Sequence, residues 1–233
     1  MHLNGLLKTE SGSITVDGMK LGDKDTMLRD VCRRVGLVFQ YPEYQLFEET
    51  VLKDVMFGAL NAGMSEEEAK ENSITALHDV GITDDLFEKS PFELSGGQKR
   101  RVAIAGVLSM RPSTIILDEP TAGLDPRGRD EIMQLIKHIH ESGATVIMVS
   151  HSMTDVSRLC TRILVMDHSR LVLDAPTENA FENEEIFKNA GLELPPCALL
   201  AFKLRKIGYH IPKNAYTLET VADAVIRNLK GGK

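Results

Sequence analysis

The sequence predicts an α/β fold built on a parallel β-sheet that is buried on both faces. Residues 114–117 and 145–149 are short, nearly continuous runs of apolar and β-branched residues, which is typical of such strands. Between them, residues 127–141 have the apolar spacing of an amphipathic helix, which Gly143 ends. A strand, a helix and a second strand in this order indicate a right-handed βαβ unit.

The segments before this unit alternate between strand and helix patterns. Ser65 followed by three glutamates is typical of a helix start with a serine cap and carboxylates in the first turn. Pro112 prevents the continuation of the helix before it. The expected elements are, in order, the end of a helix at 2–7, a strand and turn at 13–18, a strand at 34–40, helical residues at 51–80 and a helix from 98 to 110.

After the central unit we expect a strand at 163–166 and a hairpin-like segment at 171–173. Beyond Pro176 the chain is acidic and helical, and two further helices are expected at 197–207 and 217–230. The predicted domains are therefore a core over residues 1–176, with a helical subdomain at about 43–111, and a small helical appendage over 177–233.

The composition is that of an ordinary globular protein, with 42% hydrophobic and 26% charged residues. A net charge of −7 argues against a broadly cationic surface for nucleic acid. The basic cluster at residues 99–101 is interpreted as a solvated helix face, with a local basic patch as the alternative. Three scattered cysteines indicate reduced thiols. No signal peptide or apolar run of about 18 residues is found, so we expect a soluble chain whose membrane role requires a partner.

An apolar strand ends in two carboxylates, Asp118 and Glu119, at the edge where open α/β sheets bind ligands. Mg²⁺ takes hard oxygen ligands and keeps several waters, so Asp118 is a candidate metal ligand, directly or through water. Glu119 is a candidate general base that orients or deprotonates an attacking water. The alternative is that this pair only caps the helix after Pro120.

Two further polar residues end predicted strands. His151 follows the strand at 145–149, where a histidine can hydrogen-bond a γ-phosphate. A strand-end histidine is otherwise a structural residue, and here the neighbouring carboxylates favour the phosphate contact. Gln40 ends the strand at 34–40 and is a candidate ligand of Mg²⁺ or of the attacking water, although by itself it is a weak indication.

A polar turn, Leu-Ser-Gly-Gly-Gln, precedes a helix. The backbone N–H groups of Ser95, Gly96 and Gly97 can face an anion together with the serine hydroxyl. The helix that starts near Gln98 adds the positive end of its dipole. The alternative is an ordinary glycine turn. Asp125 precedes the next helix and suits either contacts across an interface or capping.

These motifs, in this order, resemble those of ATP-binding cassette (ABC) ATPases over residues 2 to about 175. The resemblance makes 94–98 the signature motif, 115–119 the Walker B strand with catalytic Glu119, Gln40 the Q-loop glutamine, 124–125 the D-loop and His151 the switch histidine. It implies a P-loop NTPase-like core with a parallel sheet and a helical subdomain. It also implies ATP and Mg²⁺ as cofactors, with Asp118 and Gln40 at the metal and with Gln40, Ser95, Gly96, Gly97, Gln98 and Asp125 at the nucleotide.

A narrower resemblance, carried by residues 38–51 and 120–126, is to the ATPase subunits of energy-coupling factor (ECF) transporters, closest to the second ATPase of the pair. It implies a motor subunit of an importer for vitamins or metal ions, peripheral on the cytoplasmic side of the cell membrane. The implied partners are a second ABC ATPase in a homo- or heterodimer, a transmembrane scaffold and a substrate-binding membrane subunit, with no nucleic acid. The scaffold's coupling helices would bind a groove at about 43–53, and their arginines would pair with Glu43, Glu48 and Glu49.

One family motif, the phosphate-binding G-x-x-x-x-G-K-[ST] loop, is not found in these 233 residues. We therefore expect an N-terminally truncated core without its first strands, which binds ATP poorly and is inactive alone. A truncated gene product and a misplaced start codon both fit. Two other functions stay open, a catalytically dead fragment or partner that contributes only its signature motif, and a soluble non-transport ABC protein. The short span between Gln40 and Leu94 and the acidic charge disfavour the latter.

Overall fold

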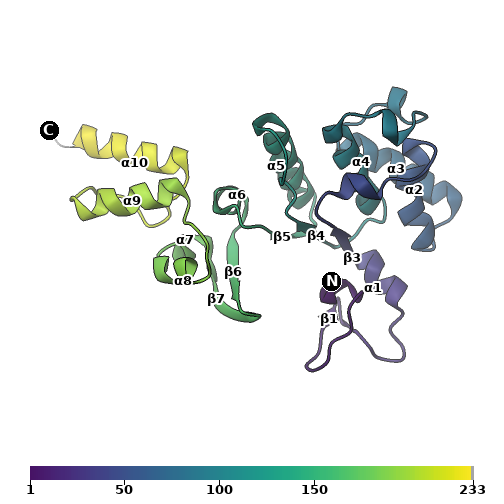
Figure 1. The fold of residues 1–233 in the computed structure, drawn as a ribbon, viewed down its shortest axis with the longest axis horizontal. Coiled ribbons are helices and arrows are strands. Elements are labelled where there is room, and N and C mark those ends of the chain that lie inside the picture. The colour runs from purple at the N-terminus through teal and green to yellow at the C-terminus, as the bar shows by residue number, and fades with distance from the viewer. Residues whose placement is uncertain (232–233) are drawn as a thin grey trace. The chain divides into compact units, whose positions relative to one another are not determined.

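A computed structural model describes residues 1–231, which form two compact units (Figure 1). The first unit runs from Met1 to Val149 and the second starts at Ser150. The domain boundary expected after residue 176 lies inside the second unit, and the division into a core and an appendage stays a prediction.

The sheet of the first unit has three parallel strands in the order β3-β4-β5. These are Val35–Val38, Thr114–Asp118 and Thr145–Val149. The expected parallel pairing is confirmed, with Ile115 opposite Val146 and Val38 opposite Leu117. Helix α5, Pro126–Glu141, connects β4 to β5 and packs against β5.

Burial on both faces is correct for β4 and wrong for β5. The central residues of β4 are at most 5% exposed, whereas Ile147 and Val149 are 37% and 51% exposed. Both β3 and β5 are edge strands of this sheet, but β3 packs against α1 and α4, whereas the helix that packs on β5 is α5. The alternate residues of β5 therefore line a face that α5 does not bury.

Three helices, α2, α3 and α4, pack on one another in the first unit (Figure 1). They span Val51–Asn61, Glu66–Asp79 and Gly96–Leu108. The helical run expected over 51–80 is therefore two helices, separated at Gly63, whose φ of 87° is left-handed. The predicted start at Ser65 is confirmed, because Ser65 and Glu68 form a complete capping box. Between α2 and α4, Gly58 lies so close to Gly106 that a Cβ at Gly58 would meet the Gly106 carbonyl oxygen at 2.7 Å.

The start of the chain contains short elements only. The helix expected over residues 2–7 is a single 3₁₀ turn, His2–Asn4, because Gly5 takes a left-handed φ of 78° and ends it. The predicted strand and turn near Gly18 are confirmed as a hairpin of β1 and β2. The remaining elements of this unit are β1 (Thr15–Val16), β2 (Met19–Lys20), α1 (Leu28–Arg34) and the 3₁₀ turns Pro42–Gln45, Asp84–Leu86 and Pro91–Glu93.

The second unit joins an antiparallel hairpin to five helices. Its strands β6 and β7 are Arg162–Asp167 and Arg170–Pro176. Its helices are α6 (Met153–Leu159), α7 (Thr177–Ala180), α8 (Glu184–Asn189), α9 (Pro196–Lys206) and α10 (Leu218–Gly231). The last two pack through Ala201, Val221 and Ala224. In residues 1–231, no helix is both long enough and apolar enough to cross a membrane.

Candidate functional site

Three of the predicted site residues lie at one edge of the sheet in the first unit. Asp118 is the last residue of β4, and Gln40 comes two residues after the end of β3, the strand beside it. Glu119 continues the hydrogen bonding between β4 and β5 by one bond, since its backbone N–H donates to the Val149 carbonyl at 2.9 Å. Because all three strands are parallel, their carboxyl ends meet at this edge.

The backbone at Glu119 is strained. Its φ of 47° lies in the left-handed region, which costs a non-glycine residue on the order of 1–2 kcal/mol. The chain therefore turns sharply out of β4 at the residue that carries the second carboxylate. Strain of this kind is concentrated at functional sites.

The oxygen atoms at this edge suit Mg²⁺. Asp118 offers a carboxylate and Gln40 an amide oxygen, and both are hard donors. Within residues 1–231, no group of three or more His, Cys, Asp and Glu side chains is arranged to hold a metal. Mg²⁺ in proteins usually has one or two carboxylate ligands and keeps several waters.

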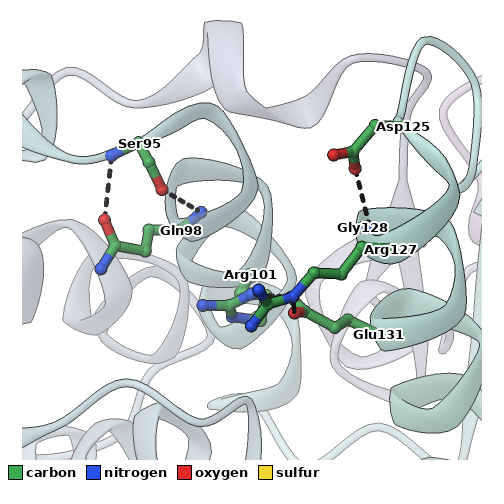
Figure 2. A network of polar contacts seen from close by, with 7 residues as sticks. All are labelled: Ser95, Gln98, Arg101, Asp125, Arg127, Gly128 and Glu131. Atoms are coloured by element: carbon green, nitrogen blue, oxygen red, sulfur yellow. Dashed lines mark hydrogen bonds and ion pairs between the residues drawn. The ribbon is translucent and has the colours of Figure 1, made fainter.

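The Leu-Ser-Gly-Gly-Gln turn begins helix α4 with a capping box (Figure 2). The Gln98 backbone N–H donates to Ser95 Oγ at 3.3 Å, and the Ser95 N–H donates to Gln98 Oε1 at 2.9 Å. A Cβ at Gly96 would meet nothing within 4 Å, so this side of the turn is open. The first N–H groups of a helix have no partner within the helix, so the turn can accept an anion.

Asp125 caps the next helix (Figure 2). Its Oδ1 accepts a hydrogen bond from the Gly128 N–H at 2.8 Å, at the start of α5. Of the two roles expected for Asp125, capping is therefore present in the chain itself. One turn further on, Glu131 pairs with Arg101 at 2.9 Å and with Arg127 at 3.1 Å, which joins α5 to α4.

The solvated face expected for residues 99–101 is wrong for Arg100, whose side chain is only 3% exposed. Its guanidinium forms a two-point ion pair with Glu43, at 2.6 and 3.0 Å. The pattern contained a signal for this burial, because Arg100 lies one turn before Ile104, which is 1% exposed. The predicted pairing of Glu43 with a membrane partner is untested, but its carboxylate already has a partner in the chain.

The segment after Gln40 presents aromatic side chains to solvent. Tyr44 is 84% exposed, and Phe47 packs edge-on against Phe57 with ring centroids 4.9 Å apart. A shallow pocket beside it is lined by Glu43, Tyr44, Leu46, Pro91, Phe92 and Lys99. Glu49 is exposed and pairs with Lys53 at 2.8 Å, and this hydrogen bond lowers the pKa of Glu49 below its usual value. The surface therefore combines exposed aromatic side chains with both acidic and basic groups, among them Lys53 and Lys99.

Glu48 is half-buried, and its backbone N–H donates to Asp54 Oδ2 at 2.8 Å. His151 belongs to the second unit. It is exposed and lies just before Ser152, which caps α6.

The family of the chain follows from comparison with known proteins. A family model described as ABC transporter matches residues 1–122. The structure of cbiO1 from Clostridium perfringens, described as part of the ABC transporter complex cbiONQ, has a TM-score of 0.70 and 39% identity over 85% of this chain and 79% of that one. The ATP-binding cassette MJ0796, solved as a dimer bound to ADP and Pi, has a TM-score of 0.63 and 30% identity over 74% of this chain and 76% of that one. The α/β ABC ATPase fold class is therefore confirmed, and the chain belongs to the ABC transporter family.

Its curated relatives narrow this further. The energy-coupling factor transporter ATP-binding protein EcfA2 of Caldanaerobacter subterraneus is 50% identical over all of this chain and 82% of its own length. The protein of the same name from Clostridium perfringens is 47% identical over 98% of this chain and 81% of its own length. Within the ABC transporter family, the chain belongs with the ATP-binding proteins of energy-coupling factor transporters.

Proposed function

We propose that the chain is one of two ATPase subunits of an ECF importer, with its catalytic residues at the carboxyl edge of the β3-β4-β5 sheet, and that these 233 residues, which contain no G-x-x-x-x-G-K-[ST] loop, do not turn over ATP on their own. The observation that carries this proposal is the placement of Gln40, Asp118 and Glu119 at that one edge. Its relatives are named as ATP-binding proteins of energy-coupling factor transporters, and this supports ATP binding and a role in transport for this chain.

Each residue of this edge has a distinct role in the proposed reaction. Asp118 and Gln40 would hold Mg²⁺ through oxygen atoms, directly or through water, and the ion would supply positive charge beside the phosphates. Glu119 accepts the proton of the attacking water or orients it, a contribution worth about 10²–10⁴ in rate. His151 belongs to the second unit, and the motif order alone assigns it a hydrogen bond to a γ-phosphate. These assignments follow the motif order and the chemistry of each side chain.

The start of α4 serves the second ATPase. Ser95, Gly96, Gly97 and Gln98 contact the γ-phosphate of a nucleotide held by that partner, through N–H groups and the helix dipole. Asp125 lies beside the same nucleotide. The open side of the turn at Gly96 supports this role, because among the described residues no atom lies within 4 Å of a Cβ placed there.

The aromatic surface after Gln40 binds the transmembrane scaffold. Exposed Tyr44 and Phe47 supply apolar contact area, and Glu48 and Glu49 pair with cationic side chains of the scaffold's coupling helices. This docking makes the chain peripheral, on the cytoplasmic side of the cell membrane. Reversing the charge of Glu48 and Glu49 together should abolish assembly with the scaffold in a pull-down assay, and intact assembly would refute this part of the proposal. Glu43 is left unchanged in this test because its carboxylate binds the buried Arg100.

The catalytic proposal is tested with Glu119→Gln in the complete transport complex. We expect ATP turnover to fall by about 10²–10⁴ while ATP binding, measured with a fluorescent analogue, is retained. Glu141→Gln, an exposed change at the far end of α5, is the matched control and should leave turnover unchanged. If Glu119→Gln has no effect whereas Ser95→Ala stops turnover, the chain contributes only its signature motif.

A further inference from the structure

Arg100 is a charged side chain enclosed by three segments of the first unit. It projects from α4, the helix that begins with the signature turn, and the residue is 2% exposed. A buried guanidinium is tolerated only where its N–H groups have acceptors. Those acceptors lie on two loops far from it in sequence.

The first loop follows Gln40. Glu43 binds the guanidinium at two points, and the ring of Tyr41 lies 5.8 Å from its central carbon. Tyr41 itself has a left-handed φ of 55°. The ion pair therefore holds a turn whose backbone is strained.

The second loop follows Glu119. Arg100 Nη1 donates to the carbonyl of Ala122 at 2.8 Å and to that of Pro120 at 3.3 Å. The two loops also meet each other, because a Cβ at Gly123 would lie 3.2 Å from the Tyr41 ring. The Arg100 guanidinium thus bonds to the loop that follows β3 and to the loop that follows β4, the two strands that end near Gln40 and Glu119.

We propose that Arg100 is a positioning residue that fastens the loops after Gln40 and Glu119 to the signature helix, so that these parts of the site keep one geometry. Glu43 also lines the shallow pocket on the aromatic surface. Through Glu43 and Arg100, this surface is therefore connected to the loop that follows Glu119. The inference rests on the proposed roles of Gln40 and Glu119. Arginine is required because lysine, a single point charge, cannot bridge a carboxylate and two carbonyls at once.

The test measures hydrogen–deuterium exchange and ATP turnover in the complete transport complex. In Arg100→Met, we expect the amides of residues 120–124 to exchange at least about tenfold faster. We expect kcat to fall at least about tenfold while the KM for ATP changes less than about threefold, because the lost contact positions catalytic groups rather than nucleotide. Arg100→Lys, which keeps the charge, should fold and should still show the faster exchange.

Ser109→Ala is the matched control. Ser109 is fully buried at the end of the same helix and donates to the carbonyls of Val55 and Gly106, away from both loops. It should lower stability without changing the exchange of residues 120–124 or kcat. Unchanged exchange in both Arg100 variants, or equal acceleration in Ser109→Ala, would overturn the inference. Because exchange does not depend on turnover, this outcome is distinct from a Glu119→Gln complex that stays active, which would refute the catalytic proposal instead.

Discussion

Ser95 and Gln98 exchange hydrogen bonds across the first turn of α4, and Ser65 and Glu68 form the same reciprocal pair at the start of α3. The Ser65 pair has distances of 3.1 and 3.2 Å, close to those of the Ser95 pair. Ser65 therefore offers a second copy of this helix cap outside the signature turn, and Thr217 and Thr220 form a third reciprocal pair at the start of α10. A comparison of variants at Ser65 and Ser95 therefore distinguishes the stability lost with a helix cap from the function lost with a ligand contact.

Ser65→Ala and Ser95→Ala should each lower the free energy of unfolding by about 1 kcal/mol, because each removes one N-cap acceptor. Urea denaturation measures this loss. Only Ser95→Ala should also weaken ATP-dependent association of the two ATPase subunits, measured by analytical ultracentrifugation with ATP. Equal weakening by Ser65→Ala would assign the effect to stability alone.

Gly58→Ala and Gly106→Ala should have opposite effects on stability. A methyl group at Gly58 would approach the Gly106 carbonyl oxygen at 2.7 Å, and overpacking of this kind costs about 1–3 kcal/mol. The methyl group at Gly106 would contact Val55 Cα at 3.9 Å without strain, and helix propensity then favours alanine by up to about 1 kcal/mol. Thermal unfolding of both variants checks this, and two changes of the same sign would contradict it.

Glu119→Gly should be more stable than Glu119→Ala by about 1 kcal/mol. Both variants remove the carboxylate, but only glycine adopts the φ of 47° without a Cβ clash. Chemical denaturation of the pair measures the difference directly. An alanine variant as stable as the glycine variant would show that the left-handed conformation is not retained after substitution.

Asp174 should contribute to stability in a pH-dependent way. Its hydrogen bonds from Arg162, at 2.7 Å each, hold the pKa of the carboxyl below its usual value of 3.8. A lowered pKa in the folded state means that the contribution is present above pH 3.8 and is lost as pH falls through the lowered pKa. The Tm difference between the parent and Asp174→Asn should therefore be constant from pH 7 to about 5 and shrink below 3.8. Because the Arg162–Asp174 pair is exposed, 1 M NaCl should also reduce the Tm difference. A Tm difference that persists at pH 2 would contradict this account.

Local patterns predicted the elements whose cause is local. Helix α5 and the cap at Ser65 follow from residues within one or two turns of each other, and the parallel β4-β5 pair follows from the strand-helix-strand order of residues 114–149. The second helix of the 51–80 run was predicted from its start at Ser65, whereas the short turn at the N-terminus was missed, because a glycine inside a helical pattern can also continue the helix. The exposed face of β5 was missed because an apolar strand looks the same in the centre of a sheet and at its edge.

The candidate site was predictable as far as it depends on strand ends. Gln40, Asp118 and Glu119 were assigned to one sheet edge because parallel strands share their carboxyl ends. Arg100 was not predicted, since its acceptor Glu43 lies 57 residues away and no local pattern connects them. The strained backbone at Glu119 was not predicted either, because glutamate gives no sign of a left-handed φ.

The left-handed turn at Glu119 also sets a hazard for protein engineering. A library of variants sorted only by heat resistance should enrich glycine at this position, since glycine relaxes the backbone. Such variants would pass the thermal screen but, under the function proposed above, would lose ATP hydrolysis because the Glu119 carboxylate is absent. Selection on this chain therefore needs a catalytic readout alongside the thermal one, or it will discard the activity it is meant to protect.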